Sequence, residues 1–448
     1  MLQNMTEGKP LSLIIPFMIP LLIGNVFQQF YNIADIIIVG RTIGVEALAA
    51  VGGISPLFMM VMMLSIGLGN GFAVITGQRY GAKDMAGVRR SIGSGTVLSV
   101  IIVCMIMLGM HLSIDYLMVM MNMPAELVKD ARDYVMIIVD GLAFMMAYNY
   151  LSAIMRSLGD SKTPLYFLII ASIANIALAL AFIIYMGWGV PGSAYAMVLA
   201  QGLSGILCIG YIYHKFPDLH LAVSDFRITW DEAWAHLRMG IPMGLQFSVI
   251  GLGIMVLQSV CNKFGGEQIA GFTTAARVEQ LAIQPMVSIG ISMAVFTAQN
   301  FGARKFDRIR EAAKKCSILA FWYSAAAAVL MFTFGKQIIG IFLDNPSEGV
   351  MHAAGLYIVY SVPAYLFFSQ MFIYRNACQG MGISAVPFCA SSIELLMRCG
   401  AAIILGDMLG YLGLCLAEPI AWTSGSIFVY LSYRYFVKVL EKKYIALE

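Results

Sequence analysis

The 448-residue sequence has little charge: Lys, Arg, Asp and Glu make up 12% of it, whereas hydrophobic residues make up 60%. In a soluble globular chain about a quarter of the residues are charged. The polar surface is therefore too small to cover a water-exposed globule, which excludes the soluble classes. Long apolar stretches recur instead, and about 20 such residues suffice to cross the hydrocarbon of a bilayer. We predict a polytopic membrane protein whose first partner is the lipid bilayer.

The chain also lacks the short motifs of common enzymes. It contains no HExxH, GxSxG or P-loop sequence. Its eight cysteines are scattered, and no pair has the spacing of a zinc or redox motif. A membrane-embedded enzyme is the least favoured alternative, and we expect no cofactor beyond a coupling ion.

Hydropathy predicts an all-α fold with twelve transmembrane helices. Each span should be a helix, because backbone polar groups in lipid must be bonded within the segment. The expected spans are 11–39, 46–76, 91–117, 131–153, 162–185, 190–213, 236–262, 269–297, 312–343, 351–377, 385–408 and 411–437.

Basic residues are distributed unevenly between the loops. With both termini in the cytoplasm, the basic loop residues on the opposite side are Arg41, Lys129, Arg132, Lys263 and Lys336. Because Lys and Arg accumulate in cytoplasmic loops, this topology is favoured for a protein of the plasma membrane. The net charge of +3 reflects topology, and no nucleic-acid partner is expected.

The two halves of the chain are related by an internal repeat. GQRYGAKDMAGVRR at 77–90 aligns without a gap with AQNFGARKFDRIRE at 298–311. Three further blocks match in the same order: GVEALAA (44–50) with GGEQIAG (265–271), RSLGDSKTP (156–164) with QGMGISAVP (379–387), and GVPGSAYA (189–196) with GYLGLCLA (410–417). Each copy has an even number of spans, so both enter the membrane in one orientation, as a parallel repeat.

The repeat predicts two six-helix lobes, 1–213 and 236–448, joined by a polar cytoplasmic connector at 214–235. Parallel repeats are typical of secondary transporters, whose substrate lies between the halves and whose access alternates by rocking. A channel is less favoured, because no filter-like carbonyl loop is recognisable. We expect a transporter of small molecules that acts as a monomer.

Asp35 has the most supporting context of the ionisable residues inside the spans. At about 100° per residue, a polar stripe lies along one face of the first helix and consists of Asn25, Gln28, Asn32 and Asp35, bordered by Tyr31. Earlier in this helix, Pro16 and Pro20 lie one turn apart and would permit a hinge. We expect Asp35 to bind a proton or a cation whose binding is coupled to bending of the helix.

Other polar residues inside the spans are candidate functional residues that fewer sequence features support. Asn175 could be a partner of Asp35 or could form a helix–helix hydrogen bond. Glu394 and Arg398, four residues apart, have the spacing of a same-helix ion pair. The candidates for a substrate cavity are Asp140, Arg277 and Glu279.

The order of these features resembles the multidrug and toxic compound extrusion family over essentially the whole chain. The resemblance rests on the two sets of six spans, YNIADIIIVGRTIGVEALAAVG (31–52), the paired GQRYGA and AQNFGA, and RSLGDSKTP. The stretch AEPIAW (417–422) is more similar to the bacterial multidrug branch than to the lipid flippases of the same superfamily.

The resemblance implies two six-helix lobes arranged in a V around a central cavity. It implies antiport, in which H⁺ or Na⁺ enters the cell while an organic, often cationic, compound is expelled across the bacterial cytoplasmic membrane. It also implies a cation site in the N-terminal lobe, where the family's aspartate and tyrosine match Asp35 and Tyr31, and its asparagines match Asn175 and Asn149.

Two positions depart from the family pattern. Ala179 stands where relatives often have an aspartate, and Met197 replaces a threonine that binds the ion in some members. Because hard cations need several oxygen ligands, these departures favour H⁺, while Na⁺ at Asp35 with backbone and water oxygens stays open. A lipid or oligosaccharide flippase is the alternative function, although few basic residues lie inside the spans to bind a pyrophosphate.

Overall fold

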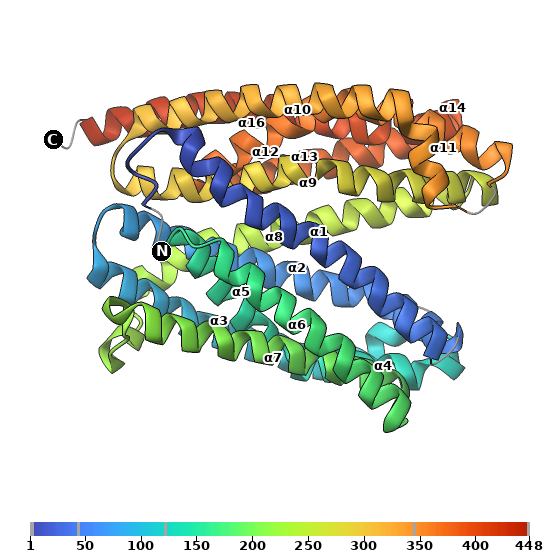
Figure 1. Cartoon of the computed structure of the whole chain (residues 1–448), viewed down its shortest axis with the longest axis horizontal. Helices are drawn as coiled ribbons and strands as arrows, with labels where there is room; N and C mark the ends of the chain where they lie inside the picture. Colours follow the sequence, from blue (N-terminus) through green and yellow to red (C-terminus); the bar gives the residue numbers. More distant parts are fainter. Residues whose placement is uncertain (1–3, 43–44, 121–122, 344–345, 446–448) are drawn as a thin grey trace. The chain divides into compact units, whose positions relative to one another are not determined.

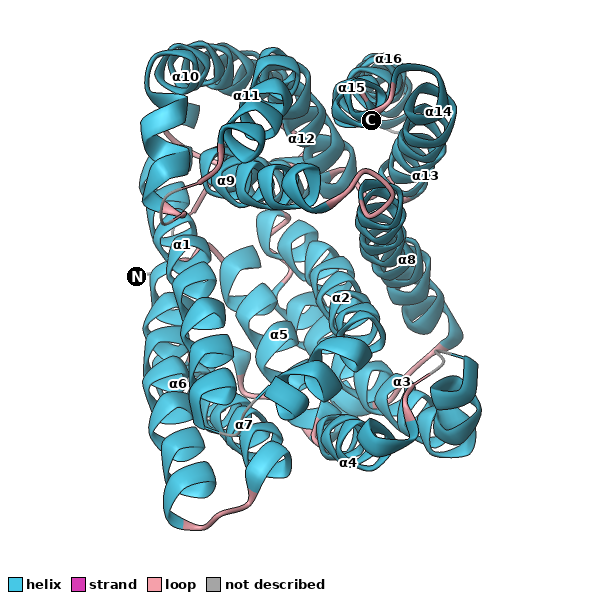
Figure 2. Cartoon of the chain, turned by 90° about the vertical axis from the view of Figure 1, so that its right-hand side faces the viewer, coloured by secondary structure: helices cyan, strands magenta, loops and turns pink. Residues whose placement is uncertain are grey.

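The computed structural model consists of helices joined by short loops (Figures 1 and 2). It describes residues 4–42, 45–120, 123–343 and 346–445, and within these ranges all side chains except those of 31–37, 39–42, 45–51, 55–56, 125 and 445.

Eleven helices of the described ranges are long and apolar enough to cross a membrane. A further pair, Glu126–Asp140 and Leu142–Ser157, is bent by 48° and makes a twelfth span if counted as one. The predicted all-α membrane fold is confirmed.

The helices of the first repeat are α1 (Pro10–Thr42), α2 (Val45–Gly81), α3 (Met85–Met120), α4 (Ala125–Asp140), α5 (Leu142–Ser157), α6 (Lys162–Leu180) with its π-helical extension η1 (Ala181–Tyr185), and α7 (Gly189–Lys215). Two short 3₁₀ turns, η2 (Pro217–Leu219) and η3 (Val223–Phe226), form the connector.

The helices of the second repeat are α8 (Trp230–Cys261), α9 (Gly266–Gly302), α10 (Phe306–Ile341), α11 (Glu348–Ser361), η4 (Val362–Ala364), α12 (Tyr365–Gly380), α13 (Ala385–Gly400), η5 (Ala401–Leu405), α14 (Gly406–Leu409), α15 (Tyr411–Cys415) and α16 (Ala417–Ile445).

The internal repeat is visible in the backbone. Lys83 and Arg304, which the paired motifs align, are the non-glycine residues of the described chain with positive φ, at 60° and 56°. The fifth span of each copy ends in a π-helical segment, η1 and η5. Such segments are rare, so their recurrence at matching places supports the duplication.

The helices pack into two units that differ from the predicted lobes 1–213 and 236–448. Ile23–Gly244 belong to the first unit, whereas Met5–Leu22 and Leu245–Glu448 belong to the second. The connector and the start of α8 therefore pack with the first repeat, and the start of α1 packs with the second. The sequence repeat cannot reveal this exchange, because it aligns residues without saying which copy each one contacts.

Proline precedes each of the two places where a helix passes from one unit to the other. Pro20 in α1 and Pro242 in α8 each lie three residues before the first residue of the next unit, Ile23 and Leu245. A proline inside a helix removes one backbone hydrogen bond. The predicted hinge at Pro16 and Pro20 thus lies where α1 leaves the second unit.

The chain before α1 is bound to the second unit by the AQNFGA motif. The Met5 backbone N–H donates to Gln299 Oε1, and Asn300 Nδ2 donates to the Met5 carbonyl, both at 2.9 Å. Lys305 Nζ donates to the Thr6 carbonyl at 2.9 Å. These bonds explain why the chain from Met5 to the start of α1 packs with the second repeat.

The start of α8 is bound to the first unit by the equivalent motif GQRYGA. Arg79 Nη2 donates to both carboxylate oxygens of Glu232 at 2.8 Å. The buried His236 ring lies 3.0 Å from Ser91 Oγ through Nε2 and 2.8 Å from the Glu232 carbonyl through Nδ1. The paired motifs therefore have one role in both copies, which is to hold the beginning of the other repeat's first helix.

Close packing of α2 on α8 depends on glycine, which gives a stability prediction. A Cβ added at Gly71 would lie 2.6 Å from Cα of Gly240, whereas one at Gly109 in α3 would meet nothing within 4 Å. Overpacking costs about 1–3 kcal/mol. We expect Gly71→Ala to lower the melting temperature of the detergent-purified protein by several degrees and Gly109→Ala to leave it unchanged. Equal melting temperatures for the two variants would contradict this packing.

Candidate functional site

The predicted ion site on α1 is described in part. The side chains of Tyr31, Asn32 and Asp35 lie outside the described residues, and α1 continues as a helix through these positions. In the described part of the polar stripe, Gln28 is exposed and Asn25 is half-buried. The roles assigned to these residues stay predictions.

Asn175 on α6 is buried, with 2% of its surface exposed. Its Oδ1 accepts no hydrogen bond from any group that the structure describes. Buried side-chain oxygens are normally bonded, so this acceptor needs a donor or a cation. One turn further along α6, Ala179 packs in a small cluster with Ile183 and Ala196, and Ile38 of α1 packs against this cluster.

That contact brings α6 close to the relevant part of α1. Ile38 is three residues after Asp35, and Ala179 is four residues after Asn175. Both pairs lie about one helical turn apart. The contact of Ile38 with this cluster therefore lies about one turn beyond the positions where Asp35 and Asn175 are expected to meet.

The other positions of the expected ion site have apolar or partly buried surroundings. Ala179 is buried, and Met197 packs on the apolar cluster around Met110 and Ile114. Asn149 is half-buried on α5, where the helix packs against Gly69 of α2. In α1, Pro16 is exposed and Pro20 is buried.

The three candidates for a substrate cavity lie in three different environments. Asp140 ends α4 at the bend, where it pairs with His111 Nε2 at 3.4 Å and its side chain is 56% exposed. Arg277 is exposed on α9. Glu279, two residues later, is buried and accepts a hydrogen bond of 2.6 Å from Tyr357 Oη. Asp140 belongs to the first unit, whereas Arg277 and Glu279 belong to the second.

The expectation of a same-helix ion pair between Glu394 and Arg398 is wrong. Arg375 Nη1 of α12 donates to Glu394 Oε1 at 3.1 Å. Arg398 Nη2 donates to Glu418 Oε2 of α16 at 2.9 Å. A pair at i,i+4 contributes only about 0.2–0.5 kcal/mol in an isolated helix, and each side chain instead meets a buried partner on a neighbouring helix.

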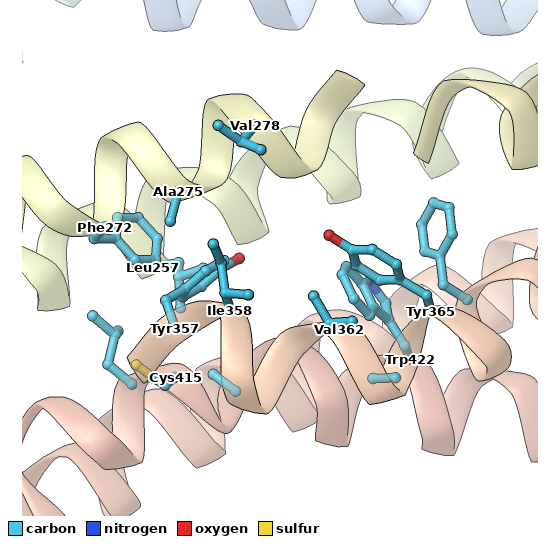
Figure 3. Close-up of a cluster of buried hydrophobic side chains, with 14 of the residues drawn as sticks. Leu257, Phe272, Ala275, Val278, Tyr357, Ile358, Val362, Tyr365, Cys415 and Trp422 are labelled. Atoms are coloured by element: carbon cyan, nitrogen blue, oxygen red, sulfur yellow. The ribbon is translucent and has the colours of Figure 1, made fainter. Parts of the chain in front are cut away.

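The two ion pairs and Glu279 form a polar interior in the second unit. All four side chains of the pairs are at least nine-tenths buried. Figure 3 shows the adjoining apolar cluster, in which Tyr357 and Tyr365 direct their hydroxyls towards α9. Tyr365 Oη, Ser361 Oγ and Glu279 Oε1 are buried and have no hydrogen-bond partner among the described groups.

Sequence reasoning missed Arg375, Tyr357 and Tyr365 as members of this interior. Arg375 lies at the end of an expected span, where an arginine normally reaches the membrane surface. The spacing of Tyr357, Ser361 and Tyr365, each four residues apart, was the available signal, since it puts three hydroxyls on one helix face. Among the described residues no group of three or more His, Cys, Asp or Glu side chains is placed to hold a metal ion.

Comparison with known proteins gives matches along most of the chain. The MatE family model matches twice, at residues 20–181 and 242–404, once in each repeat. Two relatives from Bacillus subtilis (strain 168) are the "Probable multidrug resistance protein YoeA", 28% identical over 96% of this chain and 94% of its own, and the "Probable multidrug resistance protein YpnP", 27% identical over 96% of both chains.

Solved structures give the same result at the level of the fold. A crystal structure of MATE in the bent conformation superposes with a TM-score of 0.90 at 26% identity, and the alignment covers 98% of each chain. The outward-facing conformation of a multidrug resistance MATE family transporter gives a TM-score of 0.89 at the same identity and coverage. Because the family model matches more than half of the chain and both of its repeats, the protein belongs to the MatE family, the multidrug and toxic compound extrusion transporters.

Proposed function

We propose that this protein is an antiporter of the bacterial cytoplasmic membrane that exports organic, often cationic, compounds while H⁺ or Na⁺ enters the cell. Family membership supports a transporter, and the relatives YoeA and YpnP are named as probable multidrug resistance proteins. The protein acts as a monomer with both termini in the cytoplasm. A membrane-embedded enzyme is the least favoured alternative.

The observation that carries the coupling proposal is the unsatisfied buried amide of Asn175. Its Oδ1 lacks a donor among the described groups, and α1 packs against the same stretch of α6 through Ile38. A protonated Asp35 carboxyl would supply that donor, and deprotonation would remove it. Binding of the ion would thereby change how α1, the helix that contains Pro16 and Pro20, is held.

The surroundings favour H⁺ as the coupling ion. Hard cations such as Na⁺ are held by several oxygen ligands. Ala179 and Met197 offer none, and both pack among apolar side chains. A proton needs one carboxyl and a hydrogen-bond partner, which Asp35 and Asn175 can provide. Neither Tyr31 nor Asn149 is required for the proton itself, and both would orient the acid.

The flippase alternative receives no support from the buried arginines. A lipid-linked pyrophosphate would need free basic groups. Arg375 and Arg398 are already paired with Glu394 and Glu418 inside the second unit. A small organic substrate, with Glu279, Arg277 or Asp140 as polar groups on its route, remains the better proposal.

The role of Asp35 is tested by removing its charge. We expect Asp35→Asn to abolish ethidium extrusion from energised cells at unchanged expression, because the amide cannot exchange a proton. The matched control is Asp115→Asn, which removes an exposed acid paired with Arg132, and exposed pairs contribute at most about 1 kcal/mol. Normal extrusion by the Asp35 variant would refute the assignment.

The role of Asn175 is tested by a variant that separates function from packing. Leu has the branched shape of the Asn side chain, and the substitution breaks no hydrogen bond from a described group to Asn175 Oδ1. We therefore expect Asn175→Leu to keep its melting temperature and to lose ethidium efflux. Ser172→Ala, on the same helix, removes a bond to the helix's own Leu168 carbonyl and should retain efflux. Equal efflux by both variants would rule out Asn175 as a partner of Asp35.

The identity of the ion is tested in vesicles containing the purified protein. We expect ethidium transport under a pH difference without Na⁺, and none under a Na⁺ gradient at equal pH. Vesicles with the Asp35→Asn protein serve as the control for leak. Transport under the Na⁺ gradient alone would assign the site to Na⁺.

A further inference from the structure

The second unit contains an odd number of buried charges. The buried carboxyl and guanidinium groups among its described residues are those of Glu279, Glu394, Glu418, Arg375 and Arg398. Two ion pairs account for four of them. Arg398 and Glu418 are the charged groups that act on Glu279, and because they carry opposite charges their effects on it oppose one another. Glu279 is thus left without a cation of its own.

The carboxyl of Glu279 is also incompletely hydrogen-bonded. Oε2 accepts from Tyr357 Oη at 2.6 Å, whereas Oε1 has no partner among the described groups. Ser361 and Tyr365 lie close enough to interact with this carboxyl, yet neither hydroxyl has a hydrogen-bond partner in the described part of the chain. Both residues are at most 1% exposed.

The hydroxyls of Tyr357, Ser361 and Tyr365 lie on the side that faces Glu279 because the three residues are spaced four apart in the sequence. Tyr357 and Ser361 lie on α11, and Tyr365 begins α12 after the single turn η4. Residues four apart share a helix face, and this face packs against α9. In Figure 3 the hydroxyls of Tyr357 and Tyr365 point towards α9 and towards the space between them. The other ionisable group near Tyr365 is Tyr323 of α10.

An isolated carboxylate in a dry interior is costly, and in practice such a group is neutralised. A proton on Glu279 would remove the charge and turn Oε1 into a donor. A hydroxyl can both donate and accept, so Ser361 and Tyr365 suit both states of the acid. Either hydroxyl can accept a hydrogen bond from a protonated carboxyl or donate one to a carboxylate. The surrounding groups therefore fit the gain and loss of one proton.

We propose that Glu279, with Tyr357, Ser361 and Tyr365, forms a proton-binding site in the second unit, separate from Asp35. The site has no copy in the first repeat, where the position aligned with Glu279 is Phe58. Asp35 in turn has Val256 or Leu257 as its counterpart. Asp35 and Glu279 are therefore each present in one repeat and absent from the other. The inference adds a second proton to the proposed antiport and rests on that function for its role, though proton binding itself does not require transport.

The test measures proton binding without transport. Infrared spectra of the detergent-purified protein are recorded across a pH titration, in Na⁺-free buffer, in the region of the protonated carboxyl C=O stretch. We expect the wild-type protein to show a titrating band that is lost in Glu279→Gln and kept in Asp35→Asn. Glu441→Gln, which removes an exposed partner of Arg310, is the matched control and should keep the band. Identical spectra for wild type and Glu279→Gln would overturn the proposal.

Two further variants cover the case in which Glu279→Gln does not fold. Ser361→Ala and Tyr365→Phe each remove one hydroxyl near the Glu279 carboxyl, and we expect the carboxyl band to shift in at least one of them. An unshifted band in both would overturn the site as described. The melting temperature is also measured in NaCl and in choline chloride. If it rises with NaCl alone in the wild type, and this response is lost in Glu279→Gln, the site binds Na⁺ and the proton-binding proposal is overturned. Failure of Asp35→Asn to affect efflux would count against the proposed antiport and leave these spectra unaffected.

Discussion

The ion pairs Arg375–Glu394 and Arg398–Glu418 determine how the second unit is assembled. Their four side chains lie on α12, α13 and α16, and all are buried. Removing one partner of a buried pair typically costs about 3–5 kcal/mol, because the other charge is left uncompensated. The pairs therefore restrict α13 to one rotation about its axis, with Glu394 facing α12 and Arg398 facing α16. Among the described buried acids of the second unit, Glu279 is left without a base.

The structural role of each paired sequence motif is to bind the beginning of the other repeat's first helix. Gln299 and Asn300 hold the chain before α1, and Arg79 holds the start of α8 through Glu232. Each of these helices then continues into the other unit, with a proline just before it crosses. A change in one unit can therefore act on the other along a helix. In the proposed antiport, Asp35 lies on the part of α1 that belongs to the first unit. Such a change would therefore alter the surroundings of Asp35.

Much of the fold could be predicted because its signals are local. Spans follow from hydropathy, and the duplication follows from four aligned blocks that recur as matching turns and π-helical ends. The functional residues were harder to predict from the sequence. The spacing of Glu394 and Arg398 allowed a same-helix pair, but spacing does not reveal which neighbours a helix face meets. Arg375 and Tyr357 were overlooked because their partners are 19 and 78 residues away, beyond the range of any periodic pattern.

The sequence by itself determined the membrane class, the helical fold, the repeat and the presence of one acid, Asp35, in the first copy alone. These depend on composition and on short-range order along the chain. The tertiary structure decided which residues each helix beginning contacts and which base the paired buried acids meet. It also decided that Asn175 and Glu279 each have a buried oxygen without a hydrogen-bond partner among the described groups. Such facts depend on the rotation and packing of helices, and in a bilayer packing must bring every charge to a partner within the protein or leave it to bind an ion.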